Sequence, residues 1–245
     1  MSNSCLYVVA THIGNWDDIT LRALKVLKEV DFVVCEERKS GSRLLRHYDI
    51  KKNIMLLNEH SDREDENEIF NEIFLNGKTA ALISDAGTPL FADPGSRLVH
   101  RCNDNGIPVH PVPGPSSLMA MLMISGLKLN SFQYCGFLPA NREERGNALR
   151  RYDKLKNLDL VFLEAPYRLK QVLRDMEIVL GGQRRIMLGY KLTQPEQKFL
   201  EGNIKEMRFM TSELPKGEFV IILPSDKQSF YHRSFKRNKD SDDEI

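Results

Sequence analysis

The chain has 245 residues, of which 41% are hydrophobic and 28% are charged, as in an ordinary globular protein of one or two domains. Its formal net charge of +1 excludes a global basic field, so any contact with nucleic acid has to come from a local patch. No apolar run approaches the ~18 residues of a membrane span, and the N-terminus lacks the basic segment of a signal peptide. We therefore expect a cytoplasmic protein without membrane association.

In the first half of the chain, short apolar runs alternate with amphipathic stretches. The apolar runs predict strands at residues 6–10, 32–35, 79–83 and 107–112. The amphipathic stretches predict helices at residues 18–30, 42–48, 64–75, 94–103 and 116–124. This alternation is typical of an α/β domain with a mostly parallel sheet, covered by helices on both faces.

After Gly126 the predicted strands follow one another more closely. They fall at residues 132–138, 158–164, 185–192, 198–202 and 218–223, and only two substantial helices, 142–155 and 167–180, separate them. We therefore predict an N-terminal α/β domain with a parallel sheet at residues 1–128 and a C-terminal mixed-sheet α/β domain at residues 129–224. Residues 225–245 are polar and charge-segregated, which predicts a disordered tail. Its basic stretch, 232–239, either touches RNA or, as we prefer, is solvated.

The segment LISDAGTPLFADPGSRLV, residues 82–99, places a stiff turn between a buried strand and a helix. Gly87 allows a positive φ or a close backbone approach, and Pro89 fixes the chain. Asp93 and Pro94 are predicted as the N-cap and the first residue of the helix. Asp93 is therefore expected to be structural.

A second stiff turn repeats this arrangement further along the chain. In PVPGPSSLMAML a strand is followed by residues 113–115, and Ser116 and Ser117 then open a helix. Asp85 and Gly87 likewise follow a central strand, at the edge where open α/β sheets bind their ligands. Packing alone explains either turn, but two of them on one edge favour a site for a small polar ligand.

Motifs of several common sites are absent from the sequence. There is no GxGxxG dinucleotide fingerprint, no GxxxxGK[ST] phosphate loop, no HExxH and no GxSxG elbow. His60, His100 and His110 lie far apart, and the cysteines show no CxxC spacing, so no metal site is predicted. The residues alone indicate an α/β enzyme with a small ligand.

Six stretches carry a recognisable pattern. They are LYVVATHIGNWDDITLRAL, SDAGTPLFADPG, VPGPSS, CGFLP, LEAPYRL and KGEFVIIL, in order from residue 6 to about residue 223. Together they resemble the tetrapyrrole methylase superfamily, in the branch of the small-subunit ribosomal RNA methyltransferases I. The combination of DAGTPxxxDPG, PGPS and EAPxR is far more specific than a single glycine motif.

The resemblance implies a homodimeric methyltransferase that uses S-adenosylmethionine and holds it in a cleft between two α/β domains. It also implies the acceptor, which is a ribose 2′-hydroxyl of a cytidine in small-subunit rRNA. By matching motifs, the methyl donor is expected to lie against Ile13, Gly87, Thr88, Pro89, Phe91, Ser116, Ser117, Leu163, Leu192 and Gly217.

The expected acceptor side departs from the pattern of the branch. THIGN places His12 where the branch usually has the proline of TPIGN. EERK, residues 36–39, stands in place of EDTR, and NEHS, residues 58–61, stands in place of HEHN. These substitutions concern recognition of the acceptor, since the donor motifs are kept.

A ribose hydroxyl is a weak nucleophile, so its methylation needs a base or strong orientation. Glu36 and Glu37 are candidate bases, and Lys39 is a candidate for binding a substrate phosphate; a solvated charged turn is an equally good interpretation. His12 is either a base or, more simply, a loop histidine that packs.

Three interpretations stay open at this stage. The first is methylation of rRNA, and the second is methylation of a tetrapyrrole or another small molecule. The third is a non-catalytic paralogue that binds the methyl donor without transferring the methyl group.

Overall fold

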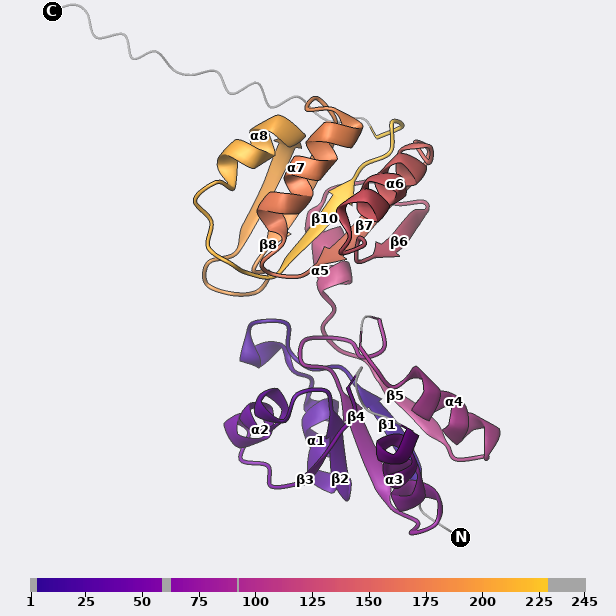
Figure 1. Cartoon of the computed structure of the whole chain (residues 1–245). Helices are drawn as coiled ribbons and strands as arrows, with labels where there is room; N and C mark the ends of the chain where they lie inside the picture. Colours follow the sequence, from indigo (N-terminus) through magenta and orange to yellow (C-terminus); the bar gives the residue numbers. More distant parts are fainter. Residues whose placement is uncertain (1–3, 59–62, 92, 229–245) are drawn as a thin grey trace, which may run out of the picture.

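The computed structural model describes residues 4–58, 63–91 and 93–228, and these fold into two α/β units with one five-stranded sheet each (Figure 1). The predicted two-unit α/β architecture is confirmed. The predictions for residues 59–61 of the NEHS motif and for residues 229–245 of the tail lie outside the described residues.

The first sheet is parallel throughout its described pairs, as predicted. Its spatial order is β3-β2-β4-β1-β5, so the loops that follow β4 and β1 reach the middle of its carboxyl edge. The sequence missed β3, which has only four residues and begins at the polar residue Asn53 directly after two lysines. The strands are β1 (Cys5–Val9), β2 (Phe32–Cys35), β3 (Asn53–Leu56), β4 (Thr79–Ile83) and β5 (Val109–Val112).

Helices cover both faces of this sheet. One core cluster holds α1 (Leu21–Glu29) and α2 (Arg38–His47), and the other holds α3 (Arg63–Phe74) and α4 (Ser96–Asp104). The helix predicted from residue 18 is interrupted, because a 3-10 turn, η1 (Trp16–Asp18), precedes α1. Thr20 then caps α1 by accepting a hydrogen bond from the backbone N–H of Ala23.

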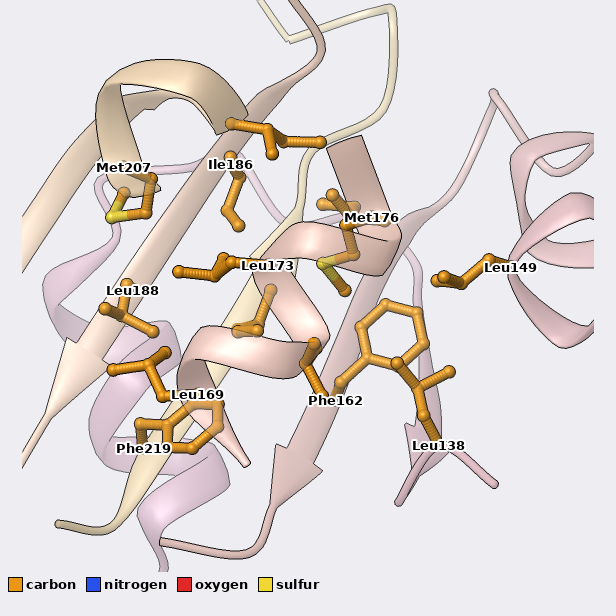
Figure 2. Close-up of a cluster of buried hydrophobic side chains, with 14 of the residues drawn as sticks. Leu138, Leu149, Phe162, Leu169, Leu173, Met176, Ile186, Leu188, Met207 and Phe219 are labelled. Atoms are coloured by element: carbon orange, nitrogen blue, oxygen red, sulfur yellow. The ribbon is translucent and has the colours of Figure 1, made fainter. Parts of the chain in front are cut away.

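The second sheet is mixed and has the order β6-β7-β10-β8-β9. Its strands β6 and β7 pair in parallel, and the remaining described pairs are antiparallel. The strands are β6 (Phe132–Gly136), β7 (Asp159–Glu164), β8 (Arg185–Tyr190), β9 (Lys198–Asn203) and β10 (Phe219–Leu223). On one face pack α6 (Arg142–Asp153), α7 (Leu169–Leu180) and α8 (Ile204–Met210), whose apolar side chains fill the core shown in Figure 2.

The other face of the second sheet is covered by α5 (Ser117–Ile124), which the sequence assigned to the first domain. Met121 is fully buried in one cluster with Val161 of β7, and Figure 1 shows α5 beside β8 and β10. A Cβ added at Gly189 of β8 would lie 2.7 Å from the sulfur of Met121, so helix and sheet are in close contact. In space, therefore, the chain crosses between the units before Ser117, earlier than residue 128.

The start of the expected tail also differs from the prediction. The backbone N–H of Ser225 donates to Asp159 Oδ1 at 2.7 Å, and Gln228 Nε2 donates to Asp159 Oδ2 at 2.8 Å. Ser225 is buried. Residues 225–228 are thus part of the second unit, because the first residue of β7 supplies a carboxylate that holds them.

Candidate functional site

The two stiff loops singled out in the sequence are tied to the loop after β1. The N–H of Thr11 donates to the carbonyl oxygen of Gly87 at 2.9 Å, and the N–H of Gly87 donates to the carbonyl oxygen of His12 at 3.1 Å. The Thr88 hydroxyl donates to the carbonyl oxygen of Pro115 at 3.0 Å. Polar groups that were candidates for a ligand are therefore used to lock the three loops together.

Position 87 requires glycine both for its backbone conformation and because neighbouring atoms leave no room for a side chain. Its φ is +87°, a region that residues with a side chain rarely adopt. A Cβ at this position would lie 2.8 Å from Ile13 Cγ2 and 3.4 Å from the carbonyl oxygen of Pro115. The structure thus brings Gly87, Ile13 and the start of α5 into direct proximity.

A cavity of about 450 Å³ opens beside these loops, between the two units. Three of the expected donor residues line it: Ile13, Ser116 and Leu192. Both units contribute, and the backbone N–H of Asn15 donates to the hydroxyl of Thr193 across the boundary at 3.0 Å. The remaining lining residues are Asp18, Thr20, Gly114, Pro115, Met119, Ala120, Met123, Ile124, Thr193 and Gln197.

The other expected donor residues are not among the described residues that line this cavity. Leu163 is partly buried against the cluster that contains Ile13 and Leu192. Phe91 is exposed, and its ring lies 5.7 Å from that of Tyr134. Pro89 is buried, Thr88 is half-buried in the same loop, and Ser117 is the first residue of α5.

Gly217 is not among the described residues that line the cavity, and it packs against Tyr190. A Cβ there would lie 2.7 Å from the Tyr190 hydroxyl oxygen, so the glycine makes room for that ring. The Tyr190 hydroxyl in turn donates to the carbonyl oxygen of Pro215 at 2.9 Å. Packing therefore explains Gly217 in this structure.

The EERK motif leads into the start of a helix. Helix α2 begins at Arg38, four residues before the predicted start, and Glu37 occupies its N-cap position. The side chains of Glu37 and Lys39 are exposed, and Glu36 is half-buried. The backbone N–H of Glu37 bonds to the carboxylate of Asp85, so this motif supports the loop after β4.

A second, smaller cavity of about 110 Å³ lies between α2, η1 and the end of β4. Asp85 and His12 contribute to its walls, and each has a buried polar atom, Oδ1 and Nδ1 respectively, with no hydrogen-bond partner among the described residues. The lining comprises His12, Trp16, Ser40, Gly41, Arg43, Leu44, Ile83, Ser84 and Asp85. Sequence reasoning named Asp85 only as a residue at the ligand edge and left it out of the site; its position in the SDAGTP motif was the available signal.

The electrostatics of the two residues run in opposite directions. Burial raises the pKa of Asp85, and the nearby carboxylates of Glu37 and Asp93 add to this, while hydrogen bonds from Ser40 and Glu37 oppose it. Burial lowers the pKa of His12, with further lowering by the charges of Arg43 and His47, and Asp18 opposes it. Burial thus favours the uncharged form of each group.

The predicted helix cap at Asp93 is wrong. Helix α4 begins at Ser96, and Gly95 is its N-cap with a φ of +119°. A Cβ on Gly95 would lie 2.8 Å from Leu82 Cδ2, so the chain needs glycine there. Asp93 instead accepts a hydrogen bond from the Ser84 hydroxyl, and burial raises its pKa.

Two further motifs of the family pattern, CGFLP and LEAPYRL, interlock in the second unit. Arg168 donates to the carbonyl oxygens of Leu138 and Pro139, both at 2.9 Å, and forms an ion pair with Glu164 at 3.1 Å. The backbone N–H of Leu138 donates to Glu164 Oε1 at 3.2 Å. This network fixes the loop after β6, and it explains why a glutamate and an arginine are spaced four residues apart.

The four cysteines are free thiols, of which Cys5, Cys35 and Cys102 are buried and Cys135 is half-buried. Burial raises the pKa of Cys35, Cys102 and Cys135 to about 11, so these thiols are poor nucleophiles. Within residues 4–58, 63–91 and 93–228, no group of three or more His, Cys, Asp or Glu side chains is placed to hold a metal ion. No helix in that part of the chain is long and apolar enough to cross a membrane.

The sequence matches a known protein family and several named relatives. The family described as Tetrapyrrole (Corrin/Porphyrin) Methylases matches residues 5–208. A protein of Halalkalibacterium halodurans named ribosomal RNA small subunit methyltransferase I is 38% identical over 219 residues, which cover 89% of this chain and 75% of that protein. A protein of the same name from Thermotoga maritima is 38% identical over 220 residues, which cover 89% of this chain and 97% of that protein.

Solved structures show the same fold. A crystal structure of diphthine synthase matches with a TM-score of 0.77 at 14% identity, covering 93% of this chain and 92% of that one. A putative diphthine synthase from Entamoeba histolytica matches with a TM-score of 0.64 at 18% identity, covering 91% and 93%. At these identities the likeness concerns architecture alone.

Proposed function

The chain belongs to the tetrapyrrole methylase family, in its branch of small-subunit ribosomal RNA methyltransferases, and from this premise we propose that it methylates the ribose 2′-hydroxyl of a cytidine in small-subunit rRNA. The methyl donor is S-adenosylmethionine. The observation that carries the proposal is an identity of 38% to a small-subunit rRNA methyltransferase I over 89% of the chain, a span that includes residues of both units.

The cavity fits a donor of this kind. Its volume of about 450 Å³ lies within the range of roughly 300–1,000 Å³ typical of small-molecule sites. Ile13, Ala120 and Leu192 line it with apolar surface, which excludes water. Asp18 Oδ2 is buried without a hydrogen-bond partner in the described part of the chain, and it can accept a hydrogen bond from a bound ligand.

When bound, S-adenosylmethionine supplies an electrophilic methyl group on a sulfonium. The chain holds and orients the donor. The hydrogen-bonded loops at Gly87 and Pro115 form a rigid wall of the cavity, and the side chains around Ile13 form an apolar wall. Such pre-organisation lowers the cost of aligning donor and acceptor.

The direct test is methylation of small ribosomal subunits from a strain that lacks this modification. We expect the purified chain to transfer a labelled methyl group to one nucleotide, which nuclease digestion and mass spectrometry identify as a 2′-O-methylcytidine. Methyl transfer to a tetrapyrrole and not to the subunits would replace the proposal by the second interpretation. Donor binding without any methylated product would support the non-catalytic one.

A substitution in the cavity wall tests whether the methyl donor binds there. Ala120→Phe fills the cavity, so calorimetry should show at least a tenfold weaker affinity for S-adenosylmethionine with little change in melting temperature. Ile178→Phe, which adds bulk to an exposed position on α7, serves as the matched control. Equal affinities of the two variants would place the donor outside this cavity.

We further propose a homodimer, located in the cytoplasm with its ribosomal substrate. Support comes from the outer face of α5, where Met119, Met123 and Ile124 are exposed beside the cavity. Apolar side chains grouped in this way are typical of interaction surfaces. Light scattering should give twice the 28.2 kDa mass of the chain, and Met123→Lys should shift the protein toward the monomer.

A further inference from the structure

The cavity of about 110 Å³ beside β4 is not used by the donor site described above. We propose that this cavity receives the acceptor ribose hydroxyl, and that the Asp85 carboxylate takes the proton of that hydroxyl during methyl transfer. The inference rests on the proposed function, because it concerns the acceptor of the same reaction.

Asp85 is held in place with one oxygen left for a ligand. Ser40 and the backbone N–H of Glu37, at the start of α2, bond to its carboxylate. Its Oδ1 is buried in the cavity wall and has no partner among the residues that the structure describes. A buried acceptor without a donor is costly, and a ligand hydroxyl would satisfy it.

His12 lines the same cavity as part of an aromatic cluster beside Arg43. Its ring lies 4.0 Å from that of Trp16, which in turn stacks on His47 at 4.2 Å. The guanidinium carbon of Arg43 lies 5.3 Å from the centre of the Trp16 ring. A small cavity that combines apolar and aromatic walls with the Asp85 carboxylate and has an exposed arginine in its lining suits a ribose and its adjoining phosphate.

The position of the small cavity relative to the donor cavity also suits methyl transfer from a donor in the large cavity to an acceptor in the small one. His12 and Ile13 are consecutive, and the first lines the small cavity while the second lines the large one. Asp85 lies two residues before Gly87. The backbone hydrogen bonds of Gly87 to Thr11 and His12 join the loop after β4 to the loop after β1. Acceptor and donor would thus meet across the loop that these residues form.

Among the residues that line the cavity, geometry favours Asp85 over His12 as the base. Hydrogen bonds from Ser40 and from the backbone N–H of Glu37 hold the Asp85 carboxylate, whereas His12 Nδ1 has no hydrogen-bond partner among the described residues to orient it. Glu36, Glu37 and Lys39, the earlier candidates, are not among the described residues that line the cavity. The base is therefore assigned to Asp85, and His12 is a positioning residue.

In the proposed methyl transfer, the hydroxyl oxygen forms a bond to the methyl carbon while the bond from that carbon to the donor sulfur breaks. The electron pair of the broken bond stays on sulfur. The sulfonium becomes a neutral thioether, and the hydroxyl proton passes to Asp85. General-base assistance of this kind is worth about 10²–10⁴ in rate.

The test compares Asp85→Asn with the wild type on unmodified small subunits at saturating donor. We expect kcat to fall about 100-fold or more, with the KM for the subunits changed less than about threefold. Calorimetry should show the same affinity for S-adenosylmethionine. Asp31→Asn is the matched control, since Asp31 is a carboxylate at the opposite end of β4, where it accepts a hydrogen bond from the N–H of Thr79, and it is not among the described residues that line the small cavity; its rate should match the wild type.

Trp16, the only tryptophan of the chain, gives a readout that does not depend on turnover. Adding protein-free small-subunit rRNA should change its fluorescence in the wild type and in Asp85→Asn alike, because the RNA still enters the cavity. Unchanged emission at saturating RNA would overturn the proposal.

Three other results would also overturn it. They are a wild-type rate in Asp85→Asn, a loss of donor affinity equal to the loss of rate, and a greater loss in His12→Gln than in Asp85→Asn. In each of these cases the wild type still methylates the subunits, so the proposed function stands. If the wild type does not methylate them, the proposed function itself fails.

Discussion

His12 is the residue at which burial and charge act most clearly in the same direction. Its pKa lies below the ordinary 6.5, first because of burial and then because of the charges of Arg43 and His47, with Asp18 opposing them. The unfolded chain therefore takes up this proton more readily than the folded one. The stability contributed by neutral His12 is full above pH 6.5 and is lost as the pH falls through 6.5 toward the folded pKa.

His12→Gln removes this titration. The melting temperature of the variant, relative to the wild type, should therefore rise when the pH is lowered from 8 to 5.5, because only the wild type has to charge a half-buried ring. Calorimetric scans of both proteins across this range measure the difference. A difference that stays constant, or that moves in favour of the wild type at low pH, would contradict the assigned burial.

At the scale of elements, α8 shows a signal that sequence reasoning had available and did not use. Asn203 accepts a hydrogen bond from the N–H of Glu206, and Glu206 accepts one from the N–H of Asn203, each at 2.9 Å. This capping box is readable in the sequence as N-x-x-E. The helix has only seven residues, and its two buried side chains, Ile204 and Met207, gave too short a pattern to detect by periodicity.

Asn203→Ala should lower the free energy of unfolding by about 1 kcal/mol, because the backbone N–H of Glu206 loses its hydrogen-bond acceptor. Glu206→Ala removes only the return bond and should cost less. Urea unfolding of both variants provides the measurement. If Glu206→Ala is the more damaging change, the packing of that side chain matters more than the cap.

At the start of α4, in contrast, the local sequence predicted the wrong N-cap residue. Asp93-Pro94 has the composition of an N-cap and first helical residue, yet the helix begins two residues beyond Pro94. The deciding factor is the φ of +119° at Gly95 together with its closeness to Leu82, which depends on a strand that packs beneath it. Local sequence shows where a turn occurs, but it does not show which tertiary contact fixes the first turn of the helix.

On the scale of the whole molecule, the motifs named three residues that line the large cavity, whereas nothing in the sequence indicated the small one. Ile13, Ser116 and Leu192 meet because two loops and two units converge, which the order of the motifs implied. The pairing of Asp85 with His12 depends on how α2 and η1 pack, and no periodicity in the sequence specifies that. The position of α5 was missed for a different reason: a helix after a parallel strand is expected to cover the same sheet.

The sequence of α5, SLMAMLMI, nevertheless differs from that of an ordinary covering helix. Apolar residues occur on all of its sides, so burying one face against a sheet leaves others that still need cover. Leu118, Met121 and Leu122 pack on the second sheet, while Met119 and Met123 line the cavity of about 450 Å³. One helix therefore forms part of the second core and part of the site.

This arrangement predicts where the chain divides into units that fold. A fragment of residues 115–228 keeps α5 on the sheet face formed in part by Val161, Met187 and Val220, and we expect it to unfold cooperatively in urea. A fragment of residues 129–228, cut at the boundary that the sequence suggested, exposes that face and should aggregate or unfold without cooperativity. Met121→Ala in the longer fragment should cost about 2–5 kcal/mol, because the side chain is fully buried. Equal, cooperative unfolding of the two fragments would show that α5 contributes little to the second unit, and it would restore the boundary near residue 128.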